Sequence, residues 1–140
     1  MAPISKKLKK PTKSASFKEY ITYYMKRKNW NQTALVECSR QSQSQVSKII
    51  NGRVLWVPMD VLICIILALQ LTVKESIDLL ARMERAFSPA SELHRAYIEL
   101  IKIYSDPGNN FPTDSTMLIV ADEYLAEWQL PGLPNDENKL

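Results

Sequence analysis

The sequence predicts an all-α fold, and three observations support this prediction. Apolar residues recur at every third or fourth position through most of the chain, as on one face of an α-helix. Ser16 with Glu19, and Thr72 with Glu75, have the spacing of a capping box, which starts a helix. No segment alternates apolar and polar residues with the period of two that is typical of strands. A length of 140 residues favours one domain with additional tails.

The first two predicted helices are short and adjacent. The first spans residues 17–28 and follows Ser16. Its apolar stripe consists of Phe17, Tyr20, Ile21, Tyr24 and Met25. Either Asn29 or Asn31 ends this helix and caps the second, which spans 32–39 and buries Leu35 and Cys38.

Three more helices are predicted before residue 88. The third begins after Ser42 and ends at Gly52, since glycine is favoured just beyond a helix C-terminus. The fourth spans 58–70, and Pro58 suits its first turn. This segment is apolar almost all round, so we expect it at the centre of the core. The fifth spans 73–87 and follows Thr72.

Two further helices are predicted in the last third of the chain, over 89–105 and 115–128. The apolar face of the second consists of Leu118, Ala121, Leu125 and Trp128. The loop between them is rich in Pro, Gly and Asn. Together they carry more apolar surface than a small five-helix domain can cover. We expect residues 88–133 either to fold back on the fifth helix or to form a dimer interface. Asp122 and Glu123 have no basic residue near them in sequence and are expected on a solvated face.

The charge of the chain is unevenly distributed. Residues 1–28 hold nine basic residues and one acidic residue, a net charge of +8, whereas residues 88–140 hold three and nine, a net of −6. The lysines at the beginning, Lys6, Lys7, Lys9, Lys10 and Lys13, predict a basic flexible arm over 1–15 that contacts a polyanion. A disordered tail that only keeps the protein soluble is the alternative.

Several classes of function are not supported by the sequence. The only histidine is His94, and the two cysteines, Cys38 and Cys64, lack metal-ligand spacing. Buried free thiols are therefore expected, with no catalytic residues, metal or cofactor, and the protein is predicted not to be an enzyme. No apolar run is long enough to cross a membrane, and no signal peptide is recognisable, so a cytoplasmic location is expected.

A polar helical face is predicted over residues 43–50. Gln43, Ser44, Ser47 and Lys48 project to one side of this helix, and Val46 and Ile49 to the other. Gln, Ser and Lys can contact base edges or phosphates, and the polar face contains no acidic residue. An ordinary solvated helix face would have the same composition, so the face alone leaves both interpretations open.

The segment "NQTALVECSRQSQSQVSKIING", residues 31–52, resembles the helix-turn-helix of the Xre type, the class of phage Cro and repressor proteins. Gln32 falls on the Gln that opens the second helix of that family. Val46, Ser47 and Ile49 fall on its apolar-Ser-x-apolar recognition helix, and Asn51 with Gly52 on its closing Asn-Gly. Residues 57–80 are similar to the fourth and fifth helices of that family, and the resemblance covers roughly 17–87.

The resemblance implies a DNA-binding surface. The positions that face the major groove correspond to Gln43, Ser44 and Lys48, with Ser47 beside them. Positions that contact the DNA backbone correspond to Gln32, Asn51 and Arg53. The sequence departs from the family in the turn, where Arg40 and Gln41 replace glycine and an apolar residue.

These observations together predict a five-helix repressor-like DNA-binding domain followed by about two further helices. The expected units are the arm (1–15), the helix-turn-helix domain (16–87), a C-terminal helical segment for packing or dimerisation (88–133) and a tail (134–140). The predicted function is a sequence-specific transcriptional regulator that binds double-stranded DNA as a homodimer, a repressor of phage or mobile-element type. The alternatives are a protein-interaction module, such as an anti-repressor or adaptor, and an antitoxin whose acidic C-terminal helices bind a protein partner.

Overall fold

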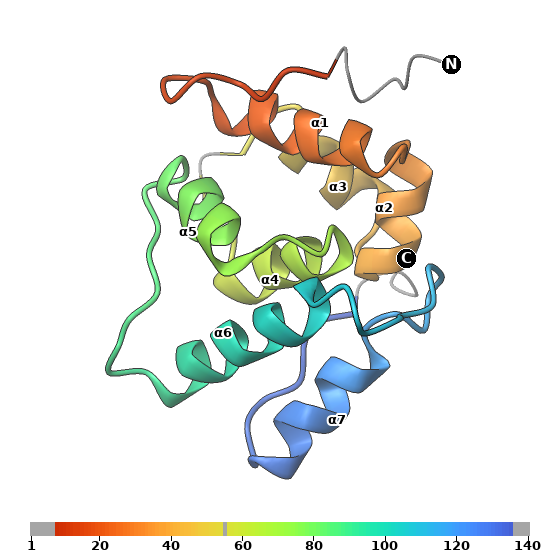
Figure 1. Cartoon of the computed structure of the whole chain (residues 1–140), viewed down its shortest axis with the longest axis vertical. Coiled ribbons are helices and arrows are strands. Elements are labelled where there is room, and N and C mark those ends of the chain that lie inside the picture. The colour runs from red at the N-terminus through yellow and green to blue at the C-terminus, as the bar shows by residue number, and fades with distance from the viewer. Residues whose placement is uncertain (1–7, 55, 136–140) are drawn as a thin grey trace.

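The computed structural model describes residues 8–54 and 56–135, and this part of the chain is all-helical, as predicted (Figure 1). The seven helices are α1 (Phe17–Arg27), α2 (Gln32–Ser39), α3 (Gln43–Ile50), α4 (Met59–Ala68), α5 (Val73–Ala81), α6 (Glu92–Ser105) and α7 (Ile119–Glu127). Helices α1 to α5 form the upper part of the molecule in Figure 1, and α6 and α7 lie below them.

Side-chain caps fix where the helices begin. Both predicted capping boxes are present, at Ser16 before α1 and at Thr72 before α5. The two asparagines after α1 have separate roles. Asn29 adopts a left-handed conformation (φ 58°) just beyond the helix, and the Asn31 side chain caps α2 by accepting from the Ala34 amide. These local contacts explain why the starts of the first helices could be predicted.

The centre of the core is α4, as its sequence predicted. Every residue from Val61 to Ala68 is buried. Helices α2 and α6 both pack against α4, while α1 contacts α3 and α5. An apolar helix surrounded in this way removes nearly all of its side-chain surface from water, which is the main favourable term in folding.

Three helix boundaries differ from prediction by three residues or more. Helix α5 ends at Ala81, not at residue 87, because Glu84 turns the backbone left-handed (φ 54°) and the Arg85 amide donates back to the Leu80 carbonyl. Helix α6 begins at Glu92, after Ser91 caps it, and not at residue 89. Helix α7 begins at Ile119, not at 115, since residues 114–117 form a turn in which the Asp114 carboxylate accepts from the Thr116 amide.

The C-terminal helices pack on the domain formed by α1 to α5. Helix α6 contacts α4 and α5, and α7 contacts α6. The Tyr104 hydroxyl joins these last two helices, because it donates to the Met117 carbonyl (2.8 Å) and accepts from the Ala121 amide (3.2 Å). The predicted apolar face of α7 is only partly correct. Leu118, Ala121 and Leu125 are buried, but Trp128 is 60% exposed.

Both cysteines are free and buried, as predicted. Burial away from water raises the pKa of the Cys38 thiol to about 11 and raises the pKa of Cys64 further. A thiol with a raised pKa is a poor nucleophile at neutral pH. The packing therefore indicates a structural role for these two side chains.

Candidate nucleic-acid interface

Helix α3 has one buried face and one exposed polar face. The Ser42 hydroxyl caps it by accepting from the Gln45 amide (3.0 Å). Val46 and Ile49 are buried in the core and fix the rotation of the helix. Gln43, Ser44 and Lys48 are exposed, and Ser47 is half-buried. The geometry thus places the side chains predicted to read bases on a single surface.

The residues after α3 are connected to this face. Asn51 caps the helix C-terminus, and its side-chain amide donates to the Ser47 carbonyl (2.8 Å). The Arg53 guanidinium donates to the Ser47 hydroxyl (3.3 Å). Gly52 has φ 67°, a conformation that favours glycine, and allows the chain to turn here. Ser47 therefore orients the Arg53 guanidinium.

Gln32 is the first residue of α2 and is half-buried. It lies where the exposed amides and the dipole of α2 favour a negative charge. This position suits a phosphate contact. Gln32 does not belong to the α3 face itself, so its predicted role differs from that of Gln43.

Lys18 adds a positive charge that the sequence did not single out. It is exposed on α1, which packs against α3, and its Cβ lies 3.9 Å from the position that a Cβ on Gly52 would occupy. The only available sequence signal was the basic character of residues 1–28 as a whole. The packing of α1 on α3 brings this charge to the end of the helix that carries Asn51.

The end of the basic arm nearest α1 is hydrogen-bonded to Tyr20 of α1 and to Arg82, the residue that follows α5. The Tyr20 hydroxyl donates to the carbonyls of Pro11 (2.9 Å) and Thr12 (3.1 Å), and Arg82 donates to those of Lys13 (2.7 Å) and Ala15 (2.9 Å). Lys9, Lys10 and Lys13 are exposed. Lys6 and Lys7, also predicted for the arm, lie outside the described residues.

The turn between α2 and α3 is held by a contact from the C-terminal part of the chain. Arg40 occupies the left-handed conformation (φ 59°) that favours glycine, and its side chain is buried. Its two terminal nitrogens donate to the two carboxylate oxygens of Asp122 on α7, at 2.5 and 3.2 Å. The expectation that Asp122 lies on a solvated face is therefore wrong, because its partner lies 82 residues earlier in the chain.

Gln41, the second unusual residue of the turn, is fully buried beside this ion pair. Its side-chain amide donates to the carbonyls of Ser39 (3.2 Å) and Pro134 (3.4 Å). The thiol of Cys64, on α4, lies 3.7 Å from the same Pro134 carbonyl. The chain after α7 thus covers the turn, and the Gln41 amide nitrogen is hydrogen-bonded in this buried environment, whereas its Oε1 accepts no hydrogen bond from the described residues.

The side chains of Trp56 and His94 make contacts elsewhere in the structure. Trp56 is 64% exposed and does not pack in the core, and the Arg85 guanidinium lies 5.0 Å from its ring centroid. His94 accepts from the Ser88 amide (2.9 Å) and stacks on Tyr97.

Among the residues described, the acidic, Cys and His side chains form no group suited to a metal ion. No helix in residues 8–54 or 56–135 is long and apolar enough to cross a membrane.

Comparison with protein families agrees with this geometry. Residues 21–80 match a family model described as a Cro/C1-type HTH DNA-binding domain. The match begins within α1 and ends within α5, so it contains α2, the turn and α3. Comparisons with curated proteins and with solved structures give no match. Residues 21–80 of this chain are therefore similar to a helix-turn-helix DNA-binding domain of the Cro/C1 type.

Proposed function

We propose that this protein is a sequence-specific transcriptional regulator that inserts α3 into the major groove of double-stranded DNA. The observation that carries this proposal is the exposed polar face of α3 within a Cro/C1-type domain. Gln43 and Ser44 lie near the N-terminus of α3 and read base edges, and Lys48 contacts guanine or phosphate. Gln32, Asn51 and Arg53 contact the DNA backbone, with Ser47 supporting Arg53.

The chain divides into functional units under this proposal. The arm (1–15) supplies affinity without sequence preference, domain 16–87 reads the site, segment 88–133 supports the domain, and 134–140 is a tail. A repressor of phage or mobile-element type would act by occupying a promoter. A reporter gene placed behind the DNA site that the protein binds would show lower expression when the protein is present. Higher expression would identify an activator.

The selected site itself comes from DNA recovered from a random pool by the wild-type protein. A repeated motif at physiological salt is the expected result. Lys48→Ala should weaken binding to that motif, whereas Lys102→Ala, an exposed lysine of α6, serves as the matched control and should bind like wild type. Recovery of DNA without any common motif would rule out sequence-specific regulation.

The arm is tested by its effect on salt dependence. Deletion of residues 1–10 removes Lys6, Lys7, Lys9 and Lys10 but retains the backbone carbonyls that Tyr20 and Arg82 bind. Each phosphate contact contributes about 0.9 to the slope of log K against log salt. We expect the slope to fall by at least about 1 while the motif stays the same. An unchanged slope would show that the arm does not contact DNA.

A homodimer is the expected binding species, because one recognition helix contacts only a few base pairs and a two-fold dimer doubles the site. Trp56 and Trp128 supply large exposed apolar side chains for such a contact, on different parts of the structure. Sedimentation velocity should show a dimer. Comparison of Trp56→Ala with Trp128→Ala then identifies the face involved, and a wild-type monomer both with and without DNA would contradict the dimer.

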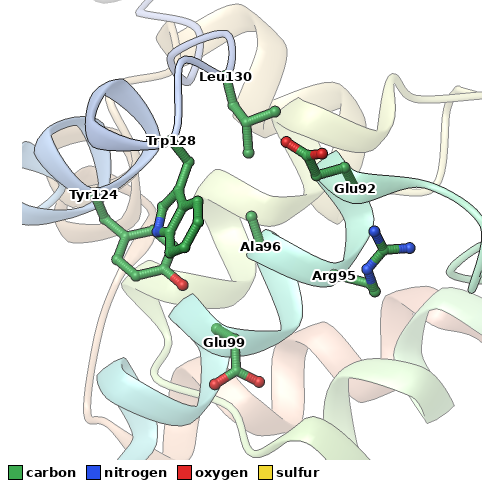
Figure 2. A pocket seen from close by; sticks show the side chains of 7 residues that line it. All are labelled: Glu92, Arg95, Ala96, Glu99, Tyr124, Trp128 and Leu130. Atoms are coloured by element: carbon green, nitrogen blue, oxygen red, sulfur yellow. The ribbon is translucent and has the colours of Figure 1, made fainter.

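A protein partner is the second candidate, and a groove of about 330 Å³ between α6 and the end of α7 favours it. Tyr124 and Trp128 line one side of the groove, and α6 contributes Glu92, Arg95 and Glu99 on the other (Figure 2). Aromatic rings next to carboxylates suit a basic partner segment. An adaptor or antitoxin role predicts that Trp128→Ala abolishes binding of that partner without changing DNA affinity.

A further inference from the structure

We propose that Asp122 is a positioning residue for DNA recognition, which sets the placement of α3 by holding Arg40 in the turn before it. This inference rests on the proposed function of α3. It concerns a residue outside the matched segment 21–80, on a helix that is not part of the helix-turn-helix. Asp122 would thus make the C-terminal segment a working part of the DNA-binding unit.

The backbone of the turn between α2 and α3 is unusual at Arg40. Arg40 is the first of the three residues that join α2 to α3, and Gln41 and Ser42 are the other two. Its left-handed conformation therefore directs the chain into α3. Residues with a Cβ are disfavoured in this conformation, and glycine is not. The paired bonds to Asp122 hold the side chain of this left-handed residue in one position.

The Asp122 carboxylate is itself held in place by neighbouring groups. One of its carboxylate oxygens accepts from the Leu133 amide (3.2 Å), and the Leu133 carbonyl lies 3.4 Å from the Arg40 guanidinium. The amide of the preceding residue, Ala121, donates a hydrogen bond to the Tyr104 hydroxyl of α6, and α6 packs on α4. The carboxylate is therefore presented from the same core that supports α2.

The position of the turn determines where the first residues of α3 lie. The turn enters α3 through Ser42, whose hydroxyl caps the helix. Gln43 and Ser44 follow at once and are the residues closest to the turn on the polar face. A shift of Arg40 would therefore move these side chains relative to base edges, whereas contacts to phosphate by the basic arm would be much less affected.

The experiment compares Asp122→Asn with Glu123→Gln, a matched change at the adjacent, exposed carboxylate. Affinity is measured for the DNA motif selected by the wild type and for unselected DNA. Loss of one base contact corresponds to about a 5- to 150-fold weaker complex. We expect a loss in this range for Asp122→Asn on the selected motif, a loss below about twofold on unselected DNA, and no loss for Glu123→Gln.

A second measurement does not depend on DNA. Amide NMR spectra of the free protein should show shifts across residues 42–50 in Asp122→Asn and none there in Glu123→Gln. If Asp122→Asn lowers thermal stability but leaves these amides and the selected-to-unselected ratio unchanged, the residue only stabilises the fold and the inference is wrong. If the amides shift but the wild type selects no motif, the positioning stands and the proposed function fails.

Arg40→Gly provides a rescue, because glycine adopts the left-handed conformation without a partner. The double variant Arg40→Gly with Asp122→Asn should recover most of the selected-to-unselected ratio lost in Asp122→Asn. It also keeps the test available if Asp122→Asn alone does not fold. A double variant with a ratio as low as that of Asp122→Asn would place the effect outside this pair and overturn the inference.

Discussion

Removing either partner of the Arg40–Asp122 ion pair should change stability by very different amounts. Asp122→Asn removes the carboxylate that the Arg40 guanidinium binds, and the Arg40 side chain is 7% exposed. Breaking a buried pair in this way costs about 3–5 kcal/mol. The Asp122 side chain is 35% exposed, so water can approach the site, and we expect about 2–3 kcal/mol.

Arg40→Gly should be much less costly. It leaves Asp122, which water can solvate, and it removes a left-handed arginine that glycine replaces with a gain of about 1 kcal/mol. The expected net loss is at most about 1 kcal/mol. Asp122→Asn should cost little in the Arg40→Gly background, so the coupling free energy between the two residues is about 2 kcal/mol.

Urea unfolding of the wild type, the two single variants and the double variant measures this coupling directly. Glu123→Gln is the control and should lie within about 0.5 kcal/mol of wild type. The reasoning is refuted if Arg40→Gly destabilises the protein more than Asp122→Asn. A coupling free energy below about 0.5 kcal/mol would also refute it.

Three further predictions follow from the packing. Ile65→Ala in fully buried α4 should cost about 2–5 kcal/mol in urea unfolding, whereas Ile77→Ala, 52% exposed, should cost less than about 0.5 kcal/mol. Ser42→Ala, which removes the α3 cap, should cost about 1 kcal/mol and weaken α3 amide protection in hydrogen exchange. Burial raises the pKa of Glu75, but hydrogen bonds from Arg27 and the Thr72 amide outweigh it and lower the pKa overall. The stability that Glu75 provides is therefore present above its unfolded pKa of about 4.3 and is lost as pH falls through the lowered pKa. Glu75→Gln should accordingly be less stable than wild type near neutral pH, with the difference vanishing in acid; a difference unchanged by pH would contradict this.

Much of the fold could be predicted because its signals are local. The capping boxes at Ser16 and Thr72 lie within four residues, and the apolar run of α4 is continuous. The exposed face of α3 followed from helical spacing alone. Helix ends were less accurate, since Glu84 ends α5 through backbone conformation in a sequence where apolar residues continue beyond it.

The buried ion pair could not have been predicted from local sequence. Asp122 and Glu123 are adjacent and chemically similar, yet only Asp122 meets Arg40, because α7 presents one of them to the turn and the other to solvent. The sequence did show that Arg40 and Gln41 depart from the usual turn. The contacts that Arg40 and Gln41 make depend on where residues 119–134 lie in the folded structure. The exposure of Trp128 has the same origin, since it depends on where α7 ends relative to α6.

The central claim, that α3 reads DNA bases, is tested most directly by repeating the random-pool selection with Gln43→Ala. The account predicts that this variant loses preference at one or two base positions of the wild-type motif and retains the others, because one side chain contacts few bases. An identical motif bound with uniformly lower affinity would contradict the claim, since it would show that Gln43 contacts the backbone and that α3 is not placed to read bases.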